Sequence, residues 1–278
     1  KDKAKHVVFI GLDGWGAYSL PKADMPNVKK LMEDGSYTLK KRSALPSSSA
    51  INWASMFMGA GPELHGYTEW GSKTPELPSR VLNKNGIFPT VFQLLRDARP
   101  EAEIGCLYEW EGIKYLVDTL SLNYHYHVAD CNKTPKELGN MASAYIKEKH
   151  PALVAICYDG PDHTGHTEGH DTPAYYEKLK ELDIYVGQIV QAVKDAGILD
   201  DTIFILTSDH GGIDKGHGGK TMQEMETAFI ISGKNIKKGL RFDDVSMMQY
   251  DVASTIASIF NLEQPQVWIG RPMKIVFK

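Results

Sequence analysis

The sequence contains little cysteine, no long apolar run and no excess of positive charge. Its three cysteines, Cys106, Cys131 and Cys157, cannot all pair with one another, which excludes a small fold built on disulfide bonds. No run of about 18 apolar residues occurs, so we expect no transmembrane helix. The chain has 31 lysines and arginines against 35 aspartates and glutamates, which excludes the strongly basic surface typical of proteins that bind nucleic-acid polymers.

These absences leave two questions open. Bound metal ions would create a local cationic site without altering the charge count, so a site for anions is compatible with the composition. Lys1 stands at the first position and no apolar signal segment can be read, so the composition does not indicate a compartment.

Apolar residues are sufficient for one large core, since 42% of the 278 residues are hydrophobic and 10% are aromatic. At about 150 residues per domain, this length corresponds to one or two domains. We find no internal repeat, low-complexity tract or convincing domain boundary. We therefore expect one catalytic domain over residues 1–278, with a loop-rich insertion around residues 59–89, where glycine and proline are frequent.

Short apolar runs rich in β-branched residues alternate with helical patterns along the chain. We expect strands at residues 6–10, 37–42, 103–108, 124–128, 152–157, 202–207, 228–231 and 274–277. We expect helices at residues 26–34, 50–58, 90–98, 135–149, 173–196 and 249–260. Continuous apolar strands that alternate with helices are typical of a mainly parallel sheet covered on both faces. The predicted fold is therefore a three-layer α/β/α domain.

Acidic and histidine residues follow three of the expected strands. In an open α/β sheet, ligands bind at the carboxyl ends of the parallel strands, because the loops there converge. We therefore expect residues separated by about 200 positions to meet in space. The acidic and histidine residues in these stretches are Asp13, then Asp159, Asp162, His163 and His166, and then Asp209, His210 and His217.

The residue types in this set point to a pair of metal ions. Carboxylates and neutral imidazoles are ligands that zinc prefers, and two such ions about 4 Å apart can clamp a phosphoryl group. Each residue alone also has a simpler interpretation. Asp13, next to Gly14, is compatible with an ordinary turn or with a weak dinucleotide-binding motif, and His163, His166 and His170 are compatible with an exposed loop. Carboxylates and histidines at three strand ends favour the two-metal interpretation.

Three consecutive serines, Ser47, Ser48 and Ser49, precede the helix expected at residues 50–58. A serine there is commonly just an N-cap. The same position directs the positive end of the helix toward an anion, and a serine hydroxyl next to a metal ion is an effective nucleophile. These roles are compatible with one another, and the spacing does not choose among the three serines.

The set of motifs resembles the alkaline phosphatase superfamily, and most closely its type I phosphodiesterase/nucleotide pyrophosphatase branch. In that branch the nucleophile lies three residues before an asparagine, and its helix leads to a Gly-x-x-Pro-Glu-x-His-Gly segment. Here Asn52 places the nucleophile at Ser49, and residues 59–66 match the segment. The other matching stretches are Gly11-Leu12-Asp13-Gly14, Pro161-Asp162-His163-Thr164-Gly165-His166 and Ser208-Asp209-His210-Gly211-Gly212 with His217.

The resemblance implies a hydrolase of phosphoric esters that acts on a small-molecule substrate through a phosphoseryl intermediate. It implies two divalent metal ions, zinc with manganese as the alternative, and an extracytoplasmic location. In this view Asn52 and a backbone amide near Ser49 hold the phosphoryl oxygens. His163 and His170 match no ligand position and would at most support the ligands. The implied ligand sets are Asp13, Ser49, Asp209 and His210 for one ion, and Asp162, His166 and His217 for the other.

The substrate is less well defined than the chemistry. The branch commonly has threonine as nucleophile, whereas Ser49 is the residue type found in phosphomonoesterases. Lys220 is the cation nearest to the motifs, and we regard it and Trp53 as candidate substrate contacts, although the simpler interpretation of Lys220 is an ordinary surface lysine. Aromatic residues expected near the mouth favour a phosphodiester or nucleotide-like substrate over a monoester. They are Trp15, Tyr18, Trp53, Tyr67 and Trp70.

Several other functions fit less well. A sulfatase would need a proline and an arginine shortly after its modified residue, and the segment Ser49-Ala50-Ile51-Asn52-Trp53 lacks both. A phosphosugar mutase generally needs a second large domain. A non-catalytic metal-binding module would not need a nucleophile, and a Rossmann-type oxidoreductase would not place Asp13 in the turn that a phosphate approaches.

Overall fold

The computed structural model describes residues 1–129 and 134–278, so Cys131 lies outside the described residues. Within them, nine strands form one sheet in the order β4-β3-β5-β1-β6-β7-β2-β8, with β9 beside β2. The strands from β4 to β6 are parallel, and β7 runs antiparallel to both β6 and β2. Their bounds are β1 His6–Leu12, β2 Gly35–Arg42, β3 Ile104–Tyr108, β4 Tyr124–His127, β5 Leu153–Tyr158, β6 Thr202–Thr207, β7 Glu226–Gly233, β8 Leu240–Arg241 and β9 Met247–Met248.

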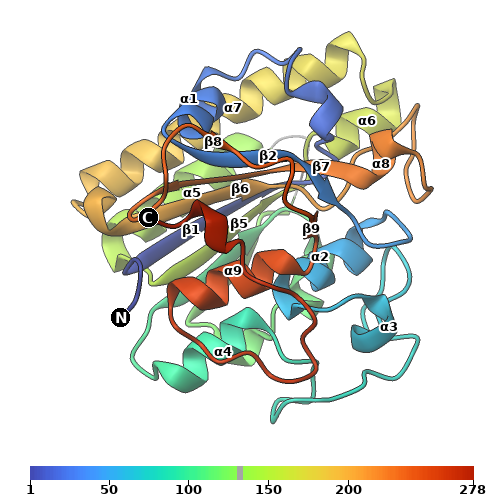
Figure 1. The fold of residues 1–278 in the computed structure, drawn as a ribbon. Helices are drawn as coiled ribbons and strands as arrows, with labels where there is room; N and C mark the ends of the chain where they lie inside the picture. Colours follow the sequence, from blue (N-terminus) through green and yellow to red (C-terminus); the bar gives the residue numbers. More distant parts are fainter. Residues whose placement is uncertain (130–133) are drawn as a thin grey trace.

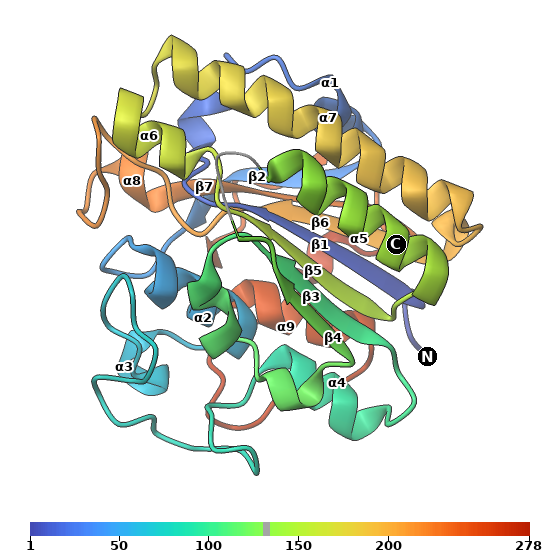
Figure 2. The same ribbon diagram turned by 180° about the vertical axis from the view of Figure 1, so that it is seen from behind.

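Helices cover both faces of the sheet (Figure 1). One layer contains α1 (Pro26–Glu33), α5 (Pro135–Lys149) and α7 (Pro173–Asp195), and the other contains α2 (Ser49–Met58), α4 (Val91–Ala98) and α9 (Asp251–Ile259). Figure 2 shows the two layers from behind, with α5 and α7 on one side of the sheet and α4 and α9 on the other. The shorter elements are the helices α3 Pro62–His65, α6 Asp162–Glu168 and α8 Met222–Met225, and the 3₁₀ helices Ala17–Ser19, Glu111–Tyr115, Thr119–Ser121, Leu199–Asp201 and Lys274–Val276. The predicted three-layer α/β/α fold is confirmed.

The central strand β1 explains why the sheet is buried on both sides. Val7 and Phe9 belong to the apolar core beneath α2, α4 and α9. Val8 and Ile10 point the other way, into the core beneath α1, α5 and α7. Because successive side chains of a strand face opposite sides, a strand covered on both faces must be apolar throughout. This is why a continuous apolar run marks β1.

The short elements α3, α8, β8 and β9 were not predicted, and two other segments differ in type from the prediction. Residues 274–277 do not form a strand: Lys274–Val276 is a 3₁₀ helix, because Pro272 precedes it and the Met273 amide donates to Thr255 Oγ1 of α9 instead of to a strand. The segment expected to be a histidine-bearing loop contains the helix α6. Cys106 and Cys157 are free and buried. In the part of the chain that the structure describes, no helix has the length and apolar character needed to cross a membrane.

Candidate active site

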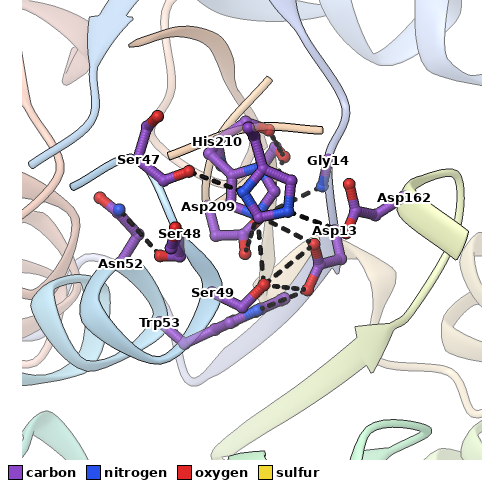
Figure 3. Close-up of polar contacts among 12 residues, drawn as sticks. Asp13, Gly14, Ser47, Ser48, Ser49, Asn52, Trp53, Asp162, Asp209 and His210 are labelled. Atoms are coloured by element: carbon purple, nitrogen blue, oxygen red, sulfur yellow. Dashed lines mark hydrogen bonds and ion pairs between the residues drawn. The ribbon is translucent and has the colours of Figure 1, made fainter. Parts of the chain in front are cut away.

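Three neighbouring parallel strands end at the same level and carry the candidate ligands. Gly11 of β1 pairs with Cys157 of β5 and with Thr207 of β6, so the residues that follow these strands emerge side by side. Asp13, Asp162 and Asp209 therefore converge, as Figure 3 shows. This is the geometry that the strand pattern predicted.

The first group consists of Asp13, Asp209 and His210, with Ser49 beside it. Ser49 Oγ lies 3.3 Å from Asp13 Oδ2 and 3.2 Å from His210 Nε2. His210 Nε2 lies 3.3 Å from Asp13 Oδ1 and 3.2 Å from Asp209 Oδ2. All four side chains are buried. The structure thus brings together the four residues expected at one metal ion.

Asp209 shows that this group suits a cation. Its Oδ1 accepts hydrogen bonds from the amides of Gly14 and His210 at 3.1 and 2.9 Å. Its Oδ2 is buried and lies 3.2 Å from His210 Nε2, but it accepts no well-aligned hydrogen bond from the described residues. A buried carboxylate oxygen without a donor is costly unless a cation binds it, so the residues fit a metal ion here.

The second group consists of Asp162, His166 and His217. Asp162 and His166 are one turn apart on α6, which places both side chains on the same face of the helix. Asp162 Oδ2 lies 3.0 Å from His166 Nε2 and 3.3 Å from His217 Nε2, and the two Nε2 atoms lie 3.2 Å apart. Nδ1 of His166 and of His217 each faces a backbone carbonyl, that of Lys215 and that of Ser47. Such anchoring leaves Nε2 as the free ligand atom, as at the histidines of protein metal sites generally.

The electrostatics of both groups reflect buried carboxylates that lie close to one another. Burial raises the pKa of Asp13 well above its usual range, and the charges of Asp209 and Asp162 raise it further. Burial also acts to raise the pKa of Asp162, but hydrogen bonds from His166, His170 and His217 hold it well below its usual range. Divalent cations would relieve the repulsion among these carboxylates.

Gly14 lets the two groups approach each other. Its φ of +73° lies in the left-handed region, and a Cβ atom there would lie 2.4 Å from Asp162 Oδ1. Any larger residue would therefore displace Asp162 or the loop after β1. The glycine is required both by the backbone conformation and by the contact.

The three serines occupy different positions. Ser49 is the first residue of α2 and faces the first group. Ser47 is fully buried, and its Oγ donates to Gly219 O at 2.7 Å and accepts from the amide of Gly218 at 3.0 Å. Ser47 therefore tethers the loop that carries His217, and Ser49 is the serine placed beside the candidate ligands.

A cavity of about 490 Å³ opens above Ser49 and the second group. Six of its lining residues are Ser49, Trp70, Trp110, Asp162, His166 and His217. Of the five aromatic residues expected at the mouth, Trp70 lines the cavity, whereas Trp15, Trp53 and Tyr67 are buried and Tyr18 stacks on Tyr175 outside the cavity lining. Trp110, which the sequence interpretation missed, follows the carboxyl end of β3, a position at which the parallel-sheet argument could have found it.

Two candidate substrate contacts lie elsewhere. Trp53 is 1% exposed, and its Nε1 donates to Asp13 Oδ2 at 3.0 Å, so it orients a candidate ligand from below (Figure 3). Lys220 is exposed and borders a different hollow, formed with residues such as Arg42 and Tyr250. Neither residue lines the cavity above Ser49, because the loop after β6 directs Lys220 away from it and the helix α2 turns Trp53 inward.

Asn52 also differs from its expected position, since its side chain is fully buried behind the serine loop. Its amide nitrogen lies within hydrogen-bonding distance of the carbonyls of Ala44, Pro46 and Ser48, at 3.0 to 3.2 Å. Its amide oxygen accepts from the Ala44 amide at 2.8 Å and from Gln249 at 3.2 Å. These contacts hold the segment before Ser49 in place and turn the amide away from the cavity.

A buried lysine completes this support. Lys41 is fully buried and donates to the carbonyl of Ser208 at 2.9 Å and to Gln249 Oε1. Burial lowers the pKa of Lys41 to about 7, although Asp209 and Asp251 oppose this effect. Gln249 in turn donates to the carbonyl of Asp209 at 2.5 Å. The network joins the loop after β6 to the helix of Ser49.

Comparison with known proteins gives the family. The family described as type I phosphodiesterase / nucleotide pyrophosphatase matches residues 7–233, which contain every candidate ligand. The chain belongs to this family. The predicted resemblance is thereby confirmed.

Curated relatives of this phosphodiesterase family member are longer than the chain itself. The bis(5'-adenosyl)-triphosphatase enpp4 of Mus musculus is 26% identical over 219 residues, which make up 75% of this chain and 47% of the relative. GPI ethanolamine phosphate transferase 3 of Schizosaccharomyces pombe is 30% identical over 122 residues, or 43% of this chain and 13% of that one. The chain thus spans about half the length of the first relative and less of the second.

Solved structures support the fold of the family. Murine ectonucleotide pyrophosphatase / phosphodiesterase 5 matches with a TM-score of 0.76 and 13% identity, over 98% of this chain and 100% of that one. A 2-O GAG sulfatase matches with a TM-score of 0.79 and 14% identity, over 98% of this chain and 73% of that one. At such low identity these matches show the shared fold and not a shared substrate.

Proposed function

We propose that this chain is a two-metal hydrolase of phosphoric esters with Ser49 as its nucleophile. The observation that carries the proposal is the position of Ser49 Oγ, 3.3 Å from Asp13 and 3.2 Å from His210, at the start of α2. Membership of the phosphodiesterase family supports the same chemistry.

The two side-chain groups would hold the metal ions. Asp13, Ser49, Asp209 and His210 would bind one, and Asp162, His166 and His217 the other. This donor set of carboxylates and imidazoles fits zinc, with manganese as the alternative. When bound, the two divalent cations would help the Ser49 hydroxyl lose its proton and would neutralise charge on the phosphoryl oxygens.

The chain's own residues account for the remaining steps. Ser49 Oγ attacks phosphorus in line with the leaving alcohol, whose oxygen takes the electron pair of the broken P–O bond. The positive end of α2 faces the phosphoryl group now bound to Ser49. Water then attacks phosphorus and Ser49 Oγ leaves, which restores the enzyme. Asn52 acts indirectly in this scheme, because it holds the segment before Ser49 instead of contacting the substrate.

The cavity favours a phosphodiester as substrate. A monoester carries a second negative charge that calls for a cation beyond the metal ions, and among the described residues that line the cavity there is no lysine or arginine. Trp70 and Trp110 instead offer apolar surface for a second organic group, such as an aryl group or a nucleoside. We therefore propose a diester or nucleotide-like substrate, with a phosphomonoester as the alternative.

A pair of chromogenic substrates tests the proposal. The ratio of kcat/KM for an aryl phosphodiester over the matching monoester, measured on the same zinc-loaded or manganese-loaded protein, should be well above one. A ratio well below one would establish a monoesterase. No turnover of either ester by metal-loaded protein would favour a non-catalytic metal-binding module, and turnover of an aryl sulfate instead would favour a sulfatase.

The family resemblance also supports an extracytoplasmic location, either periplasmic or secreted. Fractionation of cells that express the natural full-length protein, followed by antibody detection, tests this part of the proposal. Recovery in the cytoplasmic fraction alone would contradict it.

A further inference from the structure

We propose that His170 is a positioning residue that fixes the carboxylate of Asp162 for metal binding; the inference rests on the proposed function, in which Asp162 is a ligand. The side chain of His170 is 0% exposed, and its Nε2 lies 3.0 Å from Asp162 Oδ1. Its Nδ1 lies 2.9 Å from the carbonyl oxygen of Asp214, to which its own backbone amide also donates. Both ring nitrogens therefore face oxygen atoms inside the protein.

The two oxygens of Asp162 have different neighbours. His166 and His217 face Oδ2, at 3.0 and 3.3 Å, whereas His170 faces Oδ1. A carboxylate held at one oxygen cannot rotate freely, so the other oxygen stays directed at the space between His166 and His217. The contact with His170 thus occupies Oδ1 and leaves Oδ2 of Asp162 as the oxygen available to a metal ion.

The surroundings of His170 are built to fix the ring. A Cβ atom at Gly165 or at Gly212 would lie 2.3 Å from an atom of the ring, so both glycines leave the room that the ring occupies. The ring of Tyr175 packs 5.7 Å away, and its hydroxyl donates to the carbonyl of Gly14 at 2.8 Å. The imidazole therefore joins α6, the loop after β6 and, through Tyr175, the loop after β1.

The expected effect is on metal affinity. Partners that orient metal ligands typically contribute about 10- to 100-fold to affinity. Because His170 contacts Asp162 and none of the residues of the first group, its loss should lower the affinity for one of the two zinc ions by about this factor. The affinity for the other zinc ion should be unchanged. Glutamine at this position keeps an amide donor and should recover part of the loss.

Zinc titration against a chromophoric chelator tests the proposal in His170→Ala, His170→Gln and the wild type, with the exposed histidine variant His125→Gln as control. His170→Ala should lower the affinity for one zinc ion, His170→Gln should lower it less, and His125→Gln should match the wild type. In a His217→Ala background, which already lacks the second site, His170→Ala should leave the remaining zinc affinity unchanged. Thermal unfolding of the metal-free variants shows whether each one is folded.

Three results would overturn the inference. One is an unchanged affinity for both zinc ions in His170→Ala. Another is an equal loss of affinity for both ions that matches the loss of stability of the metal-free variant. A further loss of affinity in the His217→Ala background would show that His170 acts on the other site. Failure of the proposed function gives a different result, since the wild type would then bind no zinc at the Asp162 group.

Discussion

Replacing Ser49 with alanine removes the hydroxyl that lies 3.3 Å from Asp13 and 3.2 Å from His210 while leaving the proposed metal-ligating carboxylates and imidazoles in place. Alanine is favourable in a helix, so we expect a change in the free energy of unfolding of only about 1 kcal/mol. Loss of the covalent route should lower kcat/KM by about 10³-fold or more, which corresponds to about 4 kcal/mol of transition-state stabilisation.

The neighbouring serines provide matched controls. Ser48→Ala should keep near-normal kcat/KM, because its side chain shares no contact with Asp13 or His210 among the described hydrogen bonds. Ser47→Ala removes two hydrogen bonds, each contributing about 1 kcal/mol, from the loop that carries His217. Ser47→Ala should therefore lower the stability and the zinc affinity, while its kcat/KM at saturating zinc should change less. Activity of zinc-loaded Ser49→Ala within tenfold of the wild type would refute the assignment of Ser49.

Three further predictions concern other parts of the site. Burial raises the pKa of Glu109 from 4.5 to about 7, so between these values the folded chain holds a proton that the unfolded chain has released, and stability falls as the pH rises. Glu109→Gln should reduce the difference in unfolding free energy between pH 5 and pH 8 by up to about 3 kcal/mol in urea denaturation, and an unchanged difference would contradict this. Gly14→Ala should lower both the melting temperature and the zinc affinity. The control Gly86→Ala, at φ +82° with nothing within 4 Å of a Cβ, should cost only backbone strain of about 1–2 kcal/mol. Equal zinc affinities of the two variants would count against the contact between residue 14 and Asp162. Trp70→Ala and Trp110→Ala should raise KM for an aryl diester more than they lower kcat, and an unchanged KM in both would exclude the proposed aromatic walls.

Most of the fold follows from patterns visible in the sequence. The strands β1, β5 and β6 are continuous apolar runs because helices cover both of their faces, and their short length and β-branched residues mark them as strands. The 3₁₀ helix Lys274–Val276 also contains two β-branched apolar residues, but a tertiary contact with Thr255 decides its conformation. Periodicity in a four-residue window carries no information about such a contact.

The candidate site was predictable to a similar extent. The residues after parallel strands must meet at one edge of the sheet, so the positions of Asp13 and Asp209 follow from topology. The direction of a helical side chain does not follow from topology. The prediction therefore missed that Asn52 and Trp53 face the protein interior and not the cavity. His170 follows Asp162 and His166 at a spacing of four residues, as on one face of a helix. However, α6 ends at Gly169, whose φ is +105°, so the contact of His170 with Asp162 depends on tertiary structure.

The covalent intermediate gives the most direct test of the central claim that Ser49 is the nucleophile of a two-metal phosphoric ester hydrolase. Zinc-loaded protein is mixed with an aryl phosphodiester, quenched in acid within the first turnover, digested and analysed by mass spectrometry. The account predicts a peptide containing Ser49 that is heavier by the phosphoryl group with its remaining ester, and no such peptide when zinc is withheld or when Ser49→Ala is used. Turnover of the diester with an adduct on another residue, or with none at any quench time while product is released in a burst, would contradict it.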